Sequence, residues 1–247
     1  MSESAVSERV LYEDNHLIVV NKLPGELVQG DSSGDSPMGE AIKEYIRIRD
    51  AKPGNVFLGV THRLDRPTSG AVIFAKTGKA LSRINALFRE GLVEKRYWAL
   101  VDTPPPEEEG SFDDLLWKDV KKNKSFVASQ ASPGSRQAKG AKRALLKYRL
   151  LARGDRYCLL EVEIGTGRHH QIRCQLAARG MHIRGDLKYG ARRSNPDGGI
   201  SLHARSLVFE HPIGEKGRMV CCLAPPPSEP LWNYFLTVLG PEQVTGL

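Results

Sequence analysis

Short stretches typical of β-strands alternate irregularly with amphipathic helices along this chain, without a regular strand–helix–strand repeat. Two β-like runs flank the turn pair Asp14-Asn15, and a longer hairpin is expected around Gly154-Asp155. Strands joined by tight turns pair antiparallel, so this order predicts an α+β fold with a mixed, largely antiparallel central sheet and flanking helices. We expect a flexible N-terminus over residues 1–9 and a single domain over residues 10–247.

Helices are expected where apolar residues recur at helical spacing between start and stop signals. Ser36-Pro37 and Pro230 provide helix starts, and Gly240-Pro241 provides a stop. A further helix is expected to begin near His169 and to end before Gly180. The helices predicted in this way cover residues 37–49, 78–90, 169–179 and 230–239.

The chain is basic, with 36 lysine and arginine residues against 29 aspartate and glutamate residues and a net charge of +7. Such an excess favours polyanionic partners, because each cation placed against a phosphate releases condensed counterions. The excess is greatest between Lys118 and Arg143, where Asp119 is the single acid. This segment is either a solvated loop or a phosphate contact, and we favour the second interpretation.

Neither a membrane span nor a metal site is indicated. No apolar run approaches the ~20 residues that a membrane span needs, and the N-terminal residues lack the basic and apolar regions of a signal peptide. The four cysteines lack the Cys-x-x-Cys spacing of a zinc site. We therefore expect a cytoplasmic protein with reduced thiols, no bound metal and no membrane partner, and a monomer by default.

The stretch HRLDRPTSG places one carboxylate, Asp65, between Arg63 and Arg66. An arginine close to a carboxylate favours the ionised form, which suits a nucleophile or a charge stabiliser better than a general acid. A surface ion pair is the other interpretation, and it is the commoner fate of such a trio. The residues by themselves leave both interpretations open.

A second polar cluster, TGRHHQIR, covers residues 166–173. If a helix begins near His169, Arg168 lies at its N-terminus and Arg173 about one turn inside it, an arrangement that binds anions. The alternative is a helix with solvated arginines. Because two clusters rich in Arg and His stand about a hundred residues apart in the sequence, we infer one site assembled from both.

Tyr97 shares a predicted strand face with Val93, Ala99 and Val101. It is either a core tyrosine, which the pattern alone favours, or a platform for a flat base. The sequence contains no phosphate-binding loop, dinucleotide fingerprint, His-Glu-x-x-His motif or Gly-x-Ser-x-Gly elbow, so we expect no cofactor.

Five motifs, in order, resemble those of the RluA-type RNA pseudouridine synthases, which isomerise chosen uridines in ribosomal or transfer RNA. The resemblance extends from about Val10 to Phe235. It implies the pseudouridine synthase fold, RNA as the partner, flipping of the target base out of the RNA helix and an isomerase without a cofactor. The motifs are YEDNHLIVVNKLPGELV, HRLDRPTSGAVIFAKT, VEKRYWALV, TGRHHQIR followed by GMHIRGDLKYG, and LHARSLVFEHP.

The resemblance also implies roles for individual residues. Asp65 corresponds to the catalytic aspartate, and Arg173 to the arginine that pairs with it. Tyr97 corresponds to the active-site tyrosine, whose ring lies against the base and whose hydroxyl is a candidate base for the C5 proton. Contacts with the RNA are expected from the residues around these three, namely His62, Arg63, Arg168, His170, Gln171 and Ile172.

Some positions depart from the family pattern. Gln175 and His182 stand where many relatives carry His and Pro, which puts details of RNA binding in doubt. The opening motif begins by Val10, so we expect no small N-terminal S4-type RNA-binding domain, and we lean towards tRNA as the substrate. A non-catalytic RNA-binding module and a nucleobase N-glycosidase, which would release free uracil, are the alternatives.

Overall fold

The computed structural model describes residues 6–31, 33–130 and 140–245 of the 247. Among these, residues 6–95 and 204–227 form one compact unit, and residues 96–203 and 228–245 form a second. Every strand pairing with a described register is antiparallel. The predicted α+β fold with a largely antiparallel sheet and flanking helices is therefore confirmed.

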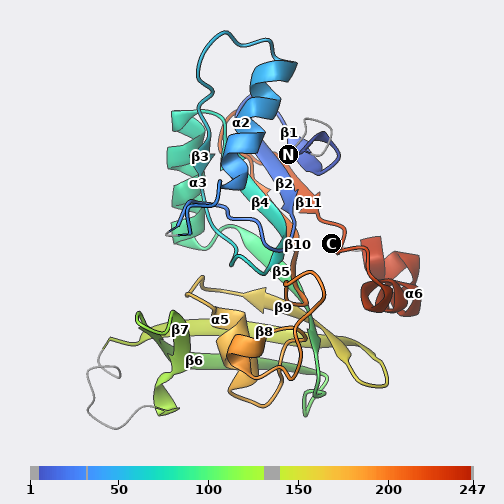
Figure 1. Cartoon of the computed structure of the whole chain (residues 1–247). Helices are drawn as coiled ribbons and strands as arrows, with labels where there is room; N and C mark the ends of the chain where they lie inside the picture. Colours follow the sequence, from blue (N-terminus) through green and yellow to red (C-terminus); the bar gives the residue numbers. More distant parts are fainter. Residues whose placement is uncertain (1–5, 32, 131–139, 246–247) are drawn as a thin grey trace. The chain divides into compact units, whose positions relative to one another are not determined.

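The strands of the first unit follow the order β1-β2-β4-β10, with β3 paired to β4 and β11 to β10. Val19, Ile73 and Phe209 from these strands are fully buried together with Ile84 of α3. Burying each such side chain contributes about 1.5–3 kcal/mol. Figure 1 shows α2 and α3 beside these strands. The elements are β1 (Val10–Glu13), β2 (Leu17–Lys22), α2 (Met38–Arg49), β3 (Gly59–Val60), β4 (Ser69–Ala75), α3 (Gly78–Glu90), β10 (Leu202–Glu210) and β11 (Met219–Leu223).

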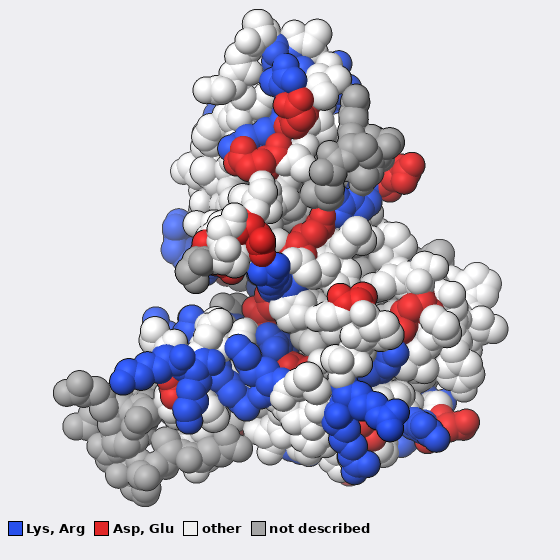
Figure 2. All heavy atoms as spheres, viewed as in Figure 1, with Lys and Arg blue, Asp and Glu red and all other residues white. Residues whose placement is uncertain are grey.

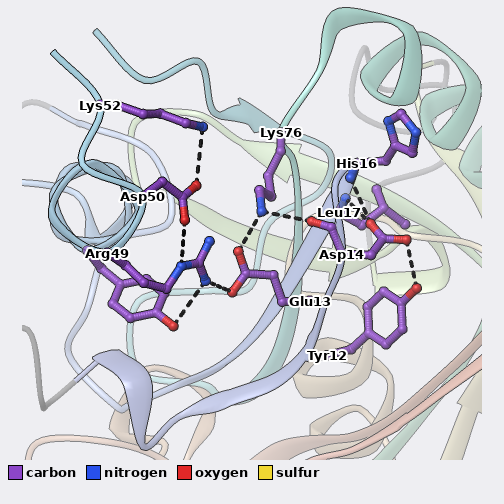
Figure 3. Close-up of polar contacts among 10 residues, drawn as sticks. Tyr12, Glu13, Asp14, His16, Leu17, Arg49, Asp50, Lys52 and Lys76 are labelled. Atoms are coloured by element: carbon purple, nitrogen blue, oxygen red, sulfur yellow. Dashed lines mark hydrogen bonds and ion pairs between the residues drawn. The ribbon is translucent and has the colours of Figure 1, made fainter. Parts of the chain in front are cut away.

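The predicted turn between β1 and β2 is held by the carboxylates of Asp14 and Glu13 (Figure 3). One carboxylate oxygen of Asp14 accepts the backbone N–H groups of His16 and Leu17, both at 2.8 Å. Lys76 donates to Glu13 at 2.6 Å and to the carbonyl of Asp14 at 2.7 Å. Burial alone would raise the pKa of both acids. Hydrogen bonds from Arg49 and Lys76 lower the pKa of Glu13, and the two backbone N–H groups lower that of Asp14, so both lie below their ordinary values.

Gly70 permits β4 and β10 to approach each other closely. Its φ is +118°, and a Cβ built there would lie 2.4 Å from the carbonyl oxygen of Ala204. No side chain fits this space, so only glycine allows β4 to pass at this point. The β4 strand begins one residue earlier, directly after the segment that carries Asp65.

The strands of the second unit follow the order β5-β9-β8-β6-β7. Trp98 and Leu159 pack against Trp232 and Phe235 of α6, while Leu116 and Cys174 belong to a smaller core on α5. Figure 1 shows α5 beside β6–β8. The elements are β5 (Glu94–Val101), β6 (Glu109–Asp119), β7 (Lys124–Val127), η1 (Ala128–Gln130), β8 (Lys142–Arg153), β9 (Cys158–Ile164), α5 (Gln171–Ala177), η2 (Leu187–Tyr189) and α6 (Pro230–Thr245).

Three boundaries differ from the sequence predictions. The helix expected over residues 169–179 is shorter, because His170 takes a left-handed conformation with φ 51° and the helix begins after it. The segment expected as a loop from Lys118 begins as the β6–β7 hairpin, and residues 131–139 lie outside the described residues. The final helix is interrupted at the predicted stop, Gly240, where φ is 72° and ψ 167°, but a further helical segment that was not predicted continues to Thr245.

The predicted domain boundaries, residues 1–9 and 10–247, stay a prediction. Within the expected flexible segment, Val6 is buried and Arg9 pairs with Glu26 at 2.8 Å. Residues 1–5 of this segment lie outside the described residues.

Candidate functional site

Residues 61–68, named here the Asp65 loop, join β3 to β4 and are tied to β4 by two side chains. Thr61 donates its hydroxyl to the carbonyl of Ile73 at 2.7 Å, and the N–H of Ile73 donates to Nε2 of His62 at 3.1 Å. The His62 ring lies 4.7 Å from the ring of Phe88. Burial, followed by the nearby charge of Lys95, lowers the pKa of His62 to about 3, so the ring is neutral. His62 thus anchors the loop as a hydrogen-bond acceptor.

A buried lysine, Lys22 at the end of β2, holds the other end of the loop. Its Nζ donates to the carbonyls of Leu23, Arg66 and Thr68 at 3.0, 2.9 and 2.6 Å. An ammonium group has three donors, so these three acceptors satisfy it completely. Burial lowers the pKa of Lys22 to about 8, although the negative charges of Glu26 and Asp65 oppose that shift. Lys22 therefore places a positive charge next to Asp65 and fixes the backbone that follows it.

The charged residues of the loop have different surroundings. Asp65 is half-buried, and its carbonyl accepts the N–H of Thr68 at 2.9 Å. Arg63 is exposed and makes a long contact, 3.4 Å, with Gln29. Arg66 pairs with Asp35 at 2.6 Å. Arg66 is thus engaged outside the loop, whereas Arg63 extends towards solvent.

The start of α5 is fastened to β8 by Gln171. Its Oε1 accepts the hydroxyl of Thr166 at 2.7 Å and the N–H of Arg168 at 3.0 Å, and its Nε2 donates to the carbonyl of Leu145 at 2.8 Å. The exposed Arg168 side chain donates to the carbonyl of Arg143 at 3.0 Å. Gln171 therefore shapes the turn before the helix through contacts within the protein.

Arg173 is buried and forms a bidentate ion pair with Asp186. Its Nε and one terminal nitrogen donate to the two carboxylate oxygens at 2.7 and 2.8 Å. Its guanidinium lies 5.1 Å from the centre of the Tyr189 ring. Ile172, the preceding residue, is also buried. The planar fork of arginine matches a carboxylate in this geometry, so the orientation of Arg173 is strongly constrained.

Two stacked histidines precede the helix, with ring centres 3.8 Å apart. His170 lies 3.0 Å from the hydroxyl of Tyr189 through Nδ1, and His169 lies 2.9 Å from the hydroxyl of Ser125. Burial, followed by the charge of Arg173, lowers the pKa of His170 to about 2. His170 is therefore a neutral hydrogen-bonding partner, in a left-handed backbone conformation that only a minority of non-glycine residues adopt.

Tyr97 lies on β5 opposite Val162 of β9, and its side chain is buried. The predicted strand is confirmed, since β5 covers Glu94–Val101, and residues 97–101 are buried on both faces of it.

Apart from Tyr97 on β5, the predicted site residues fall into two groups, one in each unit. His62, Arg63 and Asp65 share the Asp65 loop, while Arg168, His170, Gln171, Ile172 and Arg173 surround the start of α5. The pairing of Asp65 with Arg173 would join residues of different units and stays a prediction.

Two residues with a clear structural part in these groups, Lys22 and Asp186, were assigned no role from sequence. Each stood inside a quoted motif, Lys22 in VVNKLPG and Asp186 in RGDLKYG. The signal that could have indicated a role for each was its charge, inside a motif that was otherwise assigned to the site.

Chemically, the two groups offer one carboxylate on a fixed loop and several cations, histidines and amides. Within the described residues, no three His, Cys, Asp or Glu side chains gather closely enough to hold a metal ion. In the same part of the chain, no helix has the length and apolar character that crossing a membrane requires.

Comparison with known proteins identifies similar sequences. The family model for RNA pseudouridylate synthase matches residues 16–178. The chain is 33% identical over 226 residues to tRNA pseudouridine synthase C of Vibrio parahaemolyticus, covering 84% of this chain and 87% of that protein. It is 34% identical over 213 residues to ribosomal large subunit pseudouridine synthase C of Vibrio cholerae, covering 84% of this chain and 62% of that protein.

Several curated relatives are longer than this chain, which spans 65% of an RNA pseudouridine synthase of Synechocystis and 62% of the Vibrio cholerae protein. Among solved structures, human RNA pseudouridylate synthase domain containing 4 has a TM-score of 0.78 at 23% identity, covering 96% of this chain and 95% of that one. This likeness shows a common fold.

Proposed function

Because the chain belongs to the RNA pseudouridylate synthase family, we propose that it isomerises a specific uridine of tRNA or rRNA to pseudouridine, with Asp65 as its catalytic residue. The similar proteins include one named for tRNA and one named for the large ribosomal subunit, so both RNA classes are candidates. The single observation that carries the assignment to Asp65 is its position. It is the carboxylate of a loop whose backbone is tied down by His62 and Lys22.

The reaction needs no atom from outside the RNA. The bond between N1 of uracil and C1′ of ribose breaks, the base rotates, and C5 bonds to C1′. The proton leaves C5 and N1 acquires one, so the product is an isomer of the substrate. The target base must first leave the RNA helix, which costs a few kcal/mol of unstacking.

Asp65 contributes a carboxylate that adds either to the uracil ring or to C1′ while the glycosidic bond is broken. A reacting group held on a rigid backbone needs little reorganisation in the transition state. The fixed Asp65 loop supports this role. We assign Tyr97 to the base as a ring platform and as acceptor of the C5 proton, Arg173 to Asp65 as its partner, and Ile172 to the wall of the base pocket.

The remaining predicted residues are proposed to contact RNA to different degrees. Arg63 is exposed with one long contact, which suits insertion into the RNA stack. Arg168 is exposed and offers the part of its guanidinium that does not bond Arg143. The side chains of His62, His170 and Gln171 have hydrogen-bond partners within the protein. We therefore propose that they hold the protein backbone of the site in position and affect RNA binding mainly in that way.

The test is incubation of the full chain with unmodified tRNA and large-subunit rRNA transcripts, followed by carbodiimide mapping of pseudouridine. Asp65→Asn should keep the fold and RNA binding and reduce product formation roughly 10³-fold. Asp155→Asn removes an exposed carboxylate outside both groups of predicted residues and should leave turnover unchanged. Near-normal turnover by Asp65→Asn would overturn the assignment, and release of free uracil would indicate an N-glycosidase.

Binding of RNA without any product from the wild-type chain would favour a non-catalytic RNA-binding module. A cytoplasmic location and a monomeric state stay predictions, which cell fractionation and light scattering would check.

A further inference from the structure

A pocket of about 470 Å³ lies within the second unit and involves none of the predicted site residues. It is lined by the end of β5, the β8–β9 turn and the segments on both sides of η2. We name it the arginine pocket after its charged lining, which consists of Arg156, His182, Arg184, Arg192 and Arg193, with Asp102 as the single acid.

One wall of the arginine pocket is fixed by backbone hydrogen bonds to β5. The N–H of Asp102 donates to the carbonyl of His182 at 3.0 Å, and the N–H of Arg184 donates to that of Leu100 at 2.9 Å. Gly185, also in the lining, has φ +88°, and a Cβ there would lie 2.7 Å from the carbonyl oxygen of Gly199. Close packing of this chain segment therefore preserves the shape of the wall.

The positive charges of the pocket are only partly balanced. Arg184 pairs with Glu229 at 2.9 Å, and His182 lies 3.3 Å from Asp102. Arg156, Arg192 and Arg193 are exposed, and no hydrogen bond or ion pair of their side chains is found in the part of the chain that the structure describes. Four arginines against Asp102 and Glu229 leave a charge of 4 − 2 = +2.

This arrangement suits a phosphate group. A guanidinium binds phosphate oxygens through two parallel N–H donors, and uncompensated arginines gain most from such a ligand. The volume is that of an ordinary ligand pocket and exceeds what one phosphate fills, so an attached ribose or base can enter beside Tyr157. The exposed arginines let a polymer continue beyond the pocket. Figure 2 shows lysine and arginine side chains gathered on the face of this unit that carries α5.

We propose that the arginine pocket binds a phosphodiester of the RNA substrate, a proposal that rests on the proposed function. Gly185 lines the pocket, and the next residue in the chain, Asp186, holds Arg173. A phosphate bound here is thus linked through one short segment to the arginine assigned to Asp65. The pocket supplies affinity and positions the RNA strand.

The experiment compares two variants of the full chain that lose the same charge. Arg192→Ala with Arg193→Ala removes two pocket arginines, and Lys147→Ala with Arg153→Ala removes two exposed cations of β8 outside the pocket. Binding of an unmodified tRNA transcript is measured by fluorescence anisotropy from 50 to 200 mM salt. A second titration, by calorimetry, uses uridine 5′-monophosphate to detect binding of a free small phosphate.

The pocket variant should bind the transcript roughly tenfold more weakly at 100 mM salt, with the slope of log K against log salt reduced by about 1 to 2. The control pair should change affinity less than threefold, about the scatter expected for surface charges off the path of the RNA. An unchanged slope in the pocket variant would overturn the proposal. Uridine 5′-monophosphate binding that the pocket variant loses, with RNA binding intact, would reassign the pocket to a small phosphate.

These readings do not depend on catalysis. Wild-type chain that binds RNA through the pocket but forms no pseudouridine would contradict the proposed function and leave the pocket standing. If the wild-type chain forms pseudouridine and the pocket variant keeps an unaltered salt slope, the proposed function stands and the pocket proposal is contradicted.

Discussion

Arg173 and the arginine pocket belong to the same unit and are linked through Gly185-Asp186, yet they hold their charges in opposite ways. Arg173 is 5% exposed and bonded to both oxygens of Asp186. Arg192 and Arg193 are exposed, without a bonded partner among the described residues. A buried ion pair such as Arg173 with Asp186 holds its two side chains in one geometry, and salt scarcely weakens it. Exposed charge is available to a ligand and is screened by salt.

The first test removes Asp186, the carboxylate partner of the buried Arg173. Asp186→Ala should lower the free energy of unfolding by about 3–5 kcal/mol, because it leaves the Arg173 guanidinium buried without its bidentate carboxylate. Asp113→Ala is the control, since it breaks the exposed pair with Arg143 and should cost less than about 1 kcal/mol. Urea unfolding measures both, and equal losses in the two variants would contradict the distinction.

The second test concerns a buried group that must stay neutral. Burial, followed by the charge of Arg173, lowers the pKa of His170 to about 2 in the folded chain, against an ordinary value of 6.5. Between these values the unfolded chain binds more protons than the folded one, so stability rises with pH and is lost as pH falls below about 6.5.

His170→Asn, chosen because Asn tolerates a left-handed backbone, should flatten this dependence by up to about 1.4 kcal/mol per pH unit. His62, whose pKa is lowered to about 3, provides a matched case in the first unit. His62→Gln should flatten the same part of the curve. The measurement is urea unfolding between pH 4 and 7. If the free energy of unfolding keeps the same dependence on pH in both variants, His62 and His170 are not held neutral by burial.

The smallest effect is expected in the β6–β7 hairpin, whose lysines were predicted to contact phosphate. Lys124 already donates to the carbonyl of Lys188 and lies 4.8 Å from the centre of the Tyr189 ring, whereas Lys121 and Lys122 are exposed at the tip. Lys121→Ala with Lys122→Ala should weaken RNA binding a few-fold and reduce the salt slope by at most about 1. Anisotropy at two salt concentrations measures it. If neither RNA affinity nor the salt slope changes, the hairpin is an ordinary solvated turn.

The elements with a strong hydrophobic alternation were predictable from sequence, and the polar ones were not. The β1–β2 and β8–β9 hairpins and α3 were expected and are present. β6 was missed because only Phe112 and Leu116 of its eleven residues are buried, which leaves too little alternation to detect.

For the candidate site, the motifs predicted residues but not the side chains that hold them in place. Asp65 and Arg173 stood out as charged residues in unusual clusters. Lys22 resembles an ordinary surface lysine at the end of a strand, and its role depends on carbonyls that lie up to 46 residues further along the chain. Asp186 gains its meaning from Arg173, thirteen residues earlier. Such pairings depend on tertiary contacts that local sequence does not encode.

We propose that Asp65 acts in the chemical step and that the arginine pocket acts in RNA binding. The most direct test of this assignment is the single-turnover rate of pseudouridine formation at 50 and 200 mM salt. Asp65→Asn should form product roughly 10³-fold more slowly than the wild type at both concentrations. Arg192→Ala with Arg193→Ala should lose rate at 200 mM and regain most of it at 50 mM with excess protein. Turnover by Asp65→Asn within about tenfold of wild type, a loss of only about 1.4 kcal/mol in transition-state stabilisation, would contradict the account.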